Sequence, residues 1–68
     1  MTFGERLKDC RKTCGISQRQ LADKSGVAYS SIQGYENDSH DPSLFNASCM
    51  ATTLGVSIDY LAGLTDEK

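Results

Sequence analysis

Residues 16 to 36 read ISQRQLADKSGVAYSSIQGYE, and this stretch decides the fold. Ser17 can cap a helix, because its hydroxyl accepts the backbone N–H of the third helical residue, and Gln20 at that position can reach back to the cap. Gly26 lies where this helix should end and permits the positive φ that a tight turn requires. The stretch therefore predicts a short helix that begins at Ser17, a turn at Gly26 and a second helix over residues 28–37.

The second of these predicted helices has two unlike faces. Ile32 and Tyr35, spaced i and i+3, share one buried side, and Val27 before them should fill the angle between the two helices. The opposite side carries small, polar or amphipathic residues, namely Tyr29, Ser30, Gln33 and Gly34. Two short helices that cross steeply around a glycine turn form a helix-turn-helix, whose second helix can enter the DNA major groove.

Another helix is predicted before this unit. Thr2 and Glu5 can form a second capping box, and Gly15 should end that helix. Its expected apolar stripe, spaced by three or four residues, consists of Phe3, Leu7, Cys10 and Cys14. The next helix, which starts at Ser17, should stop near Lys24.

Two more helices should follow a polar loop over residues 37–42. One begins near Pro42 or Ser43 and ends at Gly55, and a short one is capped by Ser57. The inward positions expected in these two helices are Leu44, Ala47, Met50, Ala51, Leu54, Ile58, Leu61 and Ala62. Because no strand pattern is present, the chain is predicted to be all-α with five helices.

The length of 68 residues is enough for one domain, expected over residues 1–64, with a frayed tail over residues 65–68. No apolar run is long enough to cross a membrane, and the N-terminus lacks a signal-peptide pattern, so we expect a cytoplasmic protein without a membrane partner. The three cysteines are an odd number, which argues against a closed disulfide framework and fits a reducing compartment.

The formal net charge of -2 speaks against nucleic acid at first sight, because phosphate binding requires cations. The charges are unevenly distributed, however. Residues 1–24 carry six of the seven Lys and Arg residues but only three of the nine acidic residues, whereas residues 25–68 carry the opposite balance. Any DNA binding should therefore use few ion pairs and many neutral hydrogen bonds, with a shallow dependence on salt.

From about Phe3 to Leu64, the ordered set of residues resembles the Cro/CI-type (XRE) helix-turn-helix family of phage repressors and bacterial regulators. The matching residues are Gly15 to Gln18, Leu21, Ala22, Gly26, Val27, Ser31, Ile32, Tyr35, Glu36, Pro42, Ala51, Leu54 to Val56 and Asp59 to Leu61. The resemblance implies a five-helix, lambda-repressor-like DNA-binding domain. It implies transcriptional regulation, most simply repression, by a homodimer whose recognition helices enter a near-palindromic double-stranded operator.

Candidate DNA contacts follow from the polar helix face and from the resemblance. The expected base contacts are Tyr29, Ser30, Gln33 and Gly34, and the expected phosphate contacts are Gln18, Arg19, Ser31, Asn37 and Ser39. Gln33 can pair bidentately with adenine, and the helix lacks the Lys or Arg that commonly reads guanine, so A·T pairs are expected at the read positions. Gly34 is either a surface position without a role or the place where the helix approaches DNA closely.

Three further features bear on the structure around these contacts. The resemblance implies a partly buried, structural salt bridge between Arg11 and Glu36. Ala28 stands where related sequences favour Ser or Thr, and so the helix after it lacks a cap worth about 1 kcal/mol. The loop carries Asp38 and Asp41, whose negative charges near phosphates should weaken affinity.

Other kinds of function are less well supported by the residues. The set Cys10, Cys14, Cys49 and His40 lacks the spacing of a zinc module, and no Ser-His-Asp or Cys-His set has plausible geometry. We therefore expect no metal, no cofactor, no small-molecule substrate and no catalytic residue.

Two alternatives to a self-contained DNA-binding protein stay open. One is a protein-interaction module that keeps the fold with weak or no DNA binding, which the negative charge and acidic loop favour. The other is the N-terminal part of a larger regulator. Phe45 follows an inward position and either lines the helix bundle or forms part of a self-association surface.

Overall fold

Four of the five helices begin at a side-chain cap. A computed structural model of the chain describes residues 1–68, and its helices are α1 (Phe3–Thr13), α2 (Gln18–Ser25), α3 (Tyr29–Glu36), α4 (Leu44–Leu54) and α5 (Ile58–Leu61). Thr2 and Ser17 each form the predicted capping box, and Ser43 and Ser57 each accept one backbone N–H. Ala28 precedes α3 without a side-chain cap, as predicted.

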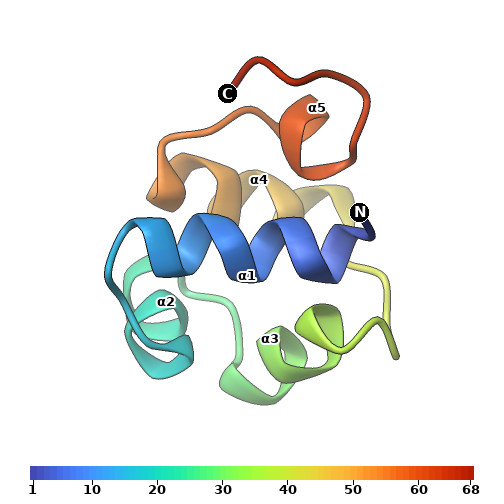
Figure 1. Ribbon diagram of the computed structural model, residues 1–68. Coiled ribbons are helices and arrows are strands. Elements are labelled where there is room, and N and C mark those ends of the chain that lie inside the picture. The colour runs from blue at the N-terminus through green and yellow to red at the C-terminus, as the bar shows by residue number, and fades with distance from the viewer.

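Helix α1 runs across the front of the molecule in the view of Figure 1 and packs against α3 and α5. The α2–α3 unit lies on one side of α1 and α5 lies on the other (Figure 1). Helix α3 packs against α1 and α2, while α4 joins α2 to α5. This arrangement leaves the side of α3 that faces away from α1 open, and it confirms the predicted all-α, five-helix architecture.

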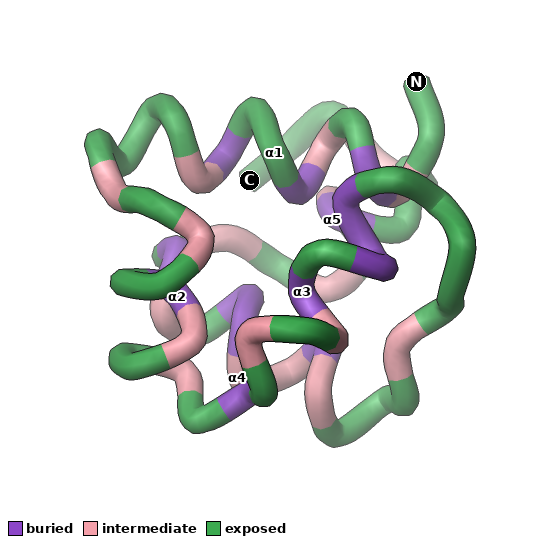
Figure 2. Tube along the Cα trace, turned by 90° about the horizontal axis from the view of Figure 1, so that it is seen from below, coloured by how far each residue is buried: buried purple, intermediate pink, exposed green.

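The core is built from the inward faces of all five helices, seen as purple segments in Figure 2. Its buried apolar residues are Leu7, Cys10, Leu21, Val27, Ile32, Tyr35, Met50, Ala51, Leu54 and Leu61. The inward positions predicted for the helix-turn-helix are therefore confirmed. None of the five helices has the length and apolar character needed to cross a membrane.

Three residues expected to point inward are exposed instead. Leu44 is 75% exposed, and Cys14 and Ala62 are exposed as well. All three lie at helix ends: Leu44 is the first residue of α4, and the other two are the C-caps of α1 and α5. Helical spacing places a residue on a face, but burial also needs a neighbouring element that covers it, and at these helix ends the side chains are left largely exposed.

Gly4 fixes the approach of α1 to the end of α3, which the sequence alone did not reveal. Gly4 is buried, and a Cβ on it would lie 2.5 Å from the Tyr35 carbonyl oxygen and 2.6 Å from that of Glu36. Real Cβ atoms essentially never come so close to backbone oxygens. The first turn of α1 therefore rests directly on the last turn of α3, which any side chain on residue 4 would prevent.

Candidate nucleic-acid interface

The turn between α2 and α3 has the predicted geometry. Gly26 ends α2 with φ of 78°, and its N–H donates to the Ala22 carbonyl at 2.9 Å. Val27 follows with only 4% of its surface exposed and fills the angle between the two helices. The turn is thus held by a backbone conformation that favours glycine and by one buried apolar side chain.

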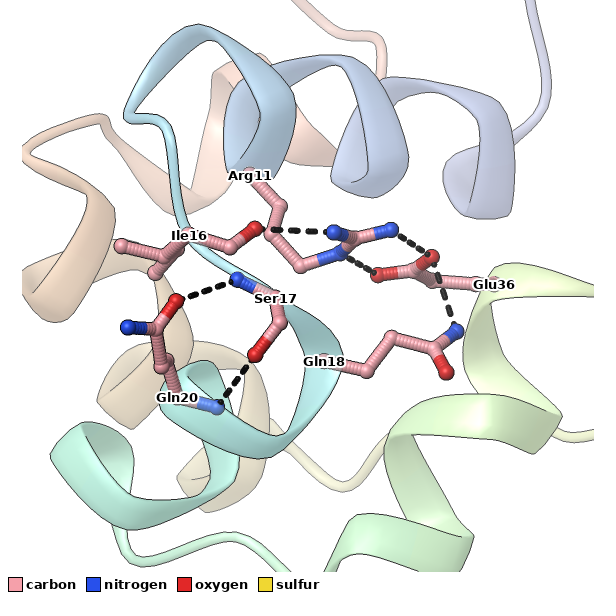
Figure 3. Close-up of polar contacts among 6 residues, drawn as sticks. All are labelled: Arg11, Ile16, Ser17, Gln18, Gln20 and Glu36. Atoms are coloured by element: carbon pink, nitrogen blue, oxygen red, sulfur yellow. Dashed lines mark hydrogen bonds and ion pairs between the residues drawn. The ribbon is translucent and has the colours of Figure 1, made fainter.

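A buried ion pair connects this unit to α1 (Figure 3). Arg11 Nε donates to Glu36 Oε2 at 2.7 Å, and a second guanidinium nitrogen donates to Oε1 at 3.0 Å. The Glu36 side chain is 2% exposed and that of Arg11 is 11% exposed. The hydrogen bond to Glu36 raises the pKa of Arg11 above its ordinary value. The predicted structural salt bridge is confirmed, in the bidentate geometry that makes such pairs strong.

Gln18 extends the same network to the start of α2 (Figure 3). Its Nε2 donates to Glu36 Oε1 at 3.1 Å, and Arg11 also donates to the Ile16 carbonyl at 2.9 Å. A glutamine amide nitrogen carries two hydrogens, so one N–H of Gln18 is still available. The backbone N–H groups of Gln18 and Arg19 also have no partner within α2, because the helix begins there. The start of α2 can therefore donate to an anion while the network holds it in place.

The outward face of α3 carries three of the four residues predicted to contact bases. Ser30 and Gln33 are exposed, and Tyr29 is half-buried. Gln33 Nε2 donates to the Tyr29 hydroxyl oxygen at 3.1 Å. Arg19 Cζ lies over the face of the Tyr29 ring, 4.2 Å from the ring centroid. Ser31, expected at a phosphate, is half-buried.

Gly34 does not lie on the exposed face, and that expectation was wrong. Its position is buried, and a Cβ there would lie 2.5 Å from His40 Cδ2. The loop after α3 folds back over this point, since Ser39 and His40 both donate backbone N–H groups to the Gly34 carbonyl. The absent side chain thus makes room for the protein's own loop, which neither of the two sequence interpretations had included.

Asp38 forms structural hydrogen bonds with the first turn of α1. Its Oδ2 accepts from the Thr2 hydroxyl at 2.7 Å, and its Oδ1 accepts from the Gly4 N–H at 3.0 Å. Its φ of 62° is left-handed, a conformation that aspartate tolerates better than most residues. No sequence signal could have paired Asp38 with the first turn of α1, because 36 residues separate it from Thr2.

Two other loop residues keep part of their hydrogen-bonding capacity. Asn37 Oδ1 accepts the Ser39 N–H at 3.0 Å, which leaves the Asn37 NH₂ group free to donate. The Ser39 hydroxyl donates to the Gly34 carbonyl at 3.3 Å. A phosphate contact from Ser39 therefore requires its hydroxyl to turn away from that carbonyl, whereas Asn37 needs no such change.

The Asp38 contacts make a prediction about pH. Hydrogen bonds from the Thr2 hydroxyl and the Gly4 N–H hold the pKa of Asp38 below its ordinary value. A carboxylate with a lower pKa in the folded state adds stability above the ordinary Asp pKa of about 3.9, and this contribution is lost as pH falls through the folded-state value. We expect Asp38→Asn to lower the thermal midpoint at pH 7 and to flatten its decline between pH 5 and pH 3.

The matched control for this prediction is Asp9→Asn, at an exposed aspartate of α1. Thermal unfolding followed by circular dichroism across the pH range is the measurement. A variant Asp38→Asn whose midpoint declines with acid as steeply as that of Asp9→Asn would contradict the assignment.

The cations of the N-terminal third are only partly available to a ligand. Arg11 is committed to Glu36, and Arg6 donates to the Tyr60 carbonyl at 3.3 Å and lies 3.6 Å from an Asp66 carboxylate oxygen. Of the remaining cations, Arg19 stands beside the exposed face of α3. Fewer cations are thus free to bind a ligand than the six in residues 1–24 suggest.

We compared the sequence with models of known protein families. A family model described as "Helix-turn-helix" matches residues 7–61, which include all of α2, α3 and α4. The chain belongs to the helix-turn-helix family. The predicted family resemblance is confirmed, and the proteins it matches are named as transcriptional regulators and repressors, a non-enzymatic class.

Two curated relatives and one solved structure illustrate the likeness. The HTH-type regulator YobD of Bacillus subtilis (strain 168) is 43% identical over 96% of this chain and 58% of its own length. The immunity repressor protein of Bacillus phage phi105 is 35% identical over 93% of this chain and 44% of its own. The P22 c2 repressor, solved with a synthetic operator, superposes with a TM-score of 0.85 at 31% identity, covering 90% of this chain and 92% of that one.

The helix-turn-helix chain spans about half the length of the curated relatives it matches. The residues described above therefore correspond only to the matched part of those longer proteins, and not to functions that lie outside it. The matched part itself contains the capped α2, the glycine turn and the exposed face of α3.

Proposed function

We propose that this helix-turn-helix protein binds a specific double-stranded DNA operator and regulates transcription, most simply as a repressor. The observation that carries the proposal is the open polar face of α3, held beside the N-terminus of α2 by the buried Arg11–Glu36–Gln18 network. The solved complex of the similar P22 c2 repressor with an operator supports the same use of the fold. The cytoplasm, where bacterial DNA lies, is the expected location.

In the proposed complex, α3 enters the major groove and α2 lies across the phosphate backbone. Gln18 donates its free N–H, together with the N-terminal backbone amides of α2, to a phosphate. Arg19, Ser31 and Asn37 supply further phosphate contacts, and Ser39 does so after its hydroxyl turns. Gln33 and Ser30 read base edges, and Tyr29 lies beside them.

We infer that two copies bind together. One helix of eight residues reads too few bases for useful specificity, so a near-palindromic operator with half-sites about 34 Å apart is expected. Leu44 and Phe45 at the start of α4 are 75% and 76% exposed, which makes them candidates for part of a contact between copies. The folded unit for this role is residues 1–64.

The rival proposal, a protein-interaction module without DNA binding, has less support from the site. Asp38 and Asp41 are the two loop acids expected to repel phosphates, and the carboxylate of Asp38 is held against the first turn of α1 by Thr2 and Gly4. Because few cations stand near α3, we still expect DNA affinity to depend only weakly on salt concentration.

The proposal is tested by selecting bound duplexes from a random pool with the wild-type protein and with Gln33→Ala. We expect the wild type to enrich an inverted repeat with A·T pairs at fixed positions. Gln33→Ala should lose its preference at one position in each half-site, a discrimination of about 1–3 kcal/mol, and keep the others.

Thr52→Ala is the matched control, since Thr52 is an exposed polar residue on α4, away from α3. It should enrich the same repeat as the wild type. If neither the wild type nor two copies joined by a flexible linker enrich any sequence, the operator proposal is wrong and the interaction module takes its place.

A further inference from the structure

Three side chains from two helices form a row on the open side of the helix-turn-helix. Arg19 from α2 lies over the Tyr29 ring, with 4.2 Å from its Cζ to the ring centroid. The Tyr29 hydroxyl oxygen accepts from Gln33 Nε2, one helical turn further along α3, at 3.1 Å. The exposed end of the row is the Gln33 amide, and its other end is anchored on a helix that should contact phosphate.

The hydrogen bond to Tyr29 restricts what the Gln33 amide can offer a ligand. A free glutamine amide presents a carbonyl acceptor and an NH₂ group with two donor hydrogens. In this structure one of these hydrogens is used by Tyr29. One N–H donor and the carbonyl oxygen are left side by side, which gives the exposed edge one donor and one acceptor.

This edge matches adenine and not guanine. In the major groove adenine presents an N7 acceptor next to an N6 amino donor, whereas guanine presents the two acceptors N7 and O6. A Gln33 amide held by Tyr29 can satisfy both groups of adenine, but it would set its carbonyl oxygen against guanine O6. Holding the amide also removes side-chain freedom before binding, which lowers the entropy lost on forming the contact.

We propose that Tyr29, supported by Arg19, is a positioning residue that makes Gln33 select adenine. This inference rests on the proposed DNA-binding function and deepens it. In this proposal Tyr29 does not contact the base. It fixes the Gln33 amide, and Gln33 makes the contact.

The test uses four proteins: the wild type, Tyr29→Phe, Gln33→Ala and the double variant. Each is titrated against three duplexes that differ only at the position whose preference Gln33→Ala loses: adenine, guanine, or purine without the 6-amino group. The wild type should prefer adenine over both others by roughly 5- to 150-fold, the range for a bidentate contact. Tyr29→Phe should reduce that preference to about a third or less of the wild-type ratio.

The double variant separates positioning from direct contact by a thermodynamic cycle. If Tyr29 acts through Gln33, adding Tyr29→Phe to Gln33→Ala leaves the base preference at this position unchanged. Tyr60→Phe is the matched control, because Tyr60 on α5 also packs against an arginine, with Arg6 Cζ 5.0 Å from its ring centroid. It should retain the wild-type preference.

Two results would overturn the inference while leaving operator binding in place. One is a Tyr29→Phe variant with the wild-type preference for adenine. The other is that Tyr29→Phe lowers the base preference by the same factor in the wild type and in the Gln33→Ala variant. A wild-type protein that binds all three duplexes equally and enriches no sequence from a random pool would instead overturn the proposed function, and this inference with it. Circular dichroism of each variant verifies that the fold is retained.

Discussion

Replacing Arg11 with methionine should destabilise the protein by about 3–5 kcal/mol, the usual effect of removing one partner of a buried ion pair. The Glu36 side chain, only 2% exposed, would then keep a single hydrogen bond from Gln18 to its carboxylate. A domain of this size has a free energy of unfolding near the lower end of the 5–15 kcal/mol range. Urea unfolding should therefore show a large loss of stability, with much of the protein unfolded at 37 °C.

Two further variants make this result specific. Lys12→Met removes the neighbouring, exposed cation of α1 and should change stability by less than about 0.5 kcal/mol. Arg11→Met combined with Glu36→Met removes both charges, and apolar replacement of a whole pair is often neutral or stabilising. The double variant should regain most of the lost stability. A single variant Arg11→Met as stable as Lys12→Met would show that the pair is not structurally important.

Gly4→Ala should be the second most damaging single substitution among those considered. The new methyl group would lie 2.5 Å from the Tyr35 carbonyl oxygen and 2.9 Å from Asp38 Oδ1, so α1 must move away from α3. Overpacking of this kind destabilises by about 1–3 kcal/mol, and the displacement would also lengthen the bond from the Gly4 N–H to Asp38. We expect a lower urea midpoint with an unchanged slope.

Helix propensity alone predicts the opposite sign, which makes the Gly4 experiment decisive. Alanine favours a helix interior by up to about 1 kcal/mol over glycine. Lys8→Ala, at an exposed position in the same helix, gives the reference for a substitution without steric conflict. If Gly4→Ala proves as stable as the wild type or more so, the close contact between α1 and α3 is not present in solution.

The parts of the fold that could be predicted are those decided by neighbours in sequence. The capping boxes at Thr2 and Ser17 and the turn at Gly26 need only residues within four positions. The pair of Arg11 and Glu36 is distant in sequence, and it came from the family resemblance and not from local pattern. Local chemistry and family likeness together thus located the helices and the frame of the site.

What the sequence could not show depends on where the loop after α3 returns. Gly34 was placed on the DNA face by helical spacing, but His40 covers it. Asp38 looked like a free charge, but it accepts hydrogen bonds from Thr2 and Gly4. The period of 3.6 residues shows which residues share a helix face, but not which loop covers that face. These contacts therefore could not be predicted from the sequence pattern.

The hydrogen bond between Tyr29 and Gln33 was only partly predictable from the sequence. Their i, i+4 spacing on a helix brings the side chains together and could have suggested the contact. The stacking of Arg19 on the same ring requires the α2–α3 angle, which spacing does not supply.

The most direct test of the account is to map the DNA-contacting surface by NMR. Backbone amide shifts of the labelled protein would be followed while the selected operator, or an unrelated duplex of equal length, is added. We predict that operator-specific changes fall on the start of α2, the exposed face of α3 and residues 37–40. Changes centred on α4 and α5, or identical changes with both duplexes, would contradict the claim that α3 reads the operator.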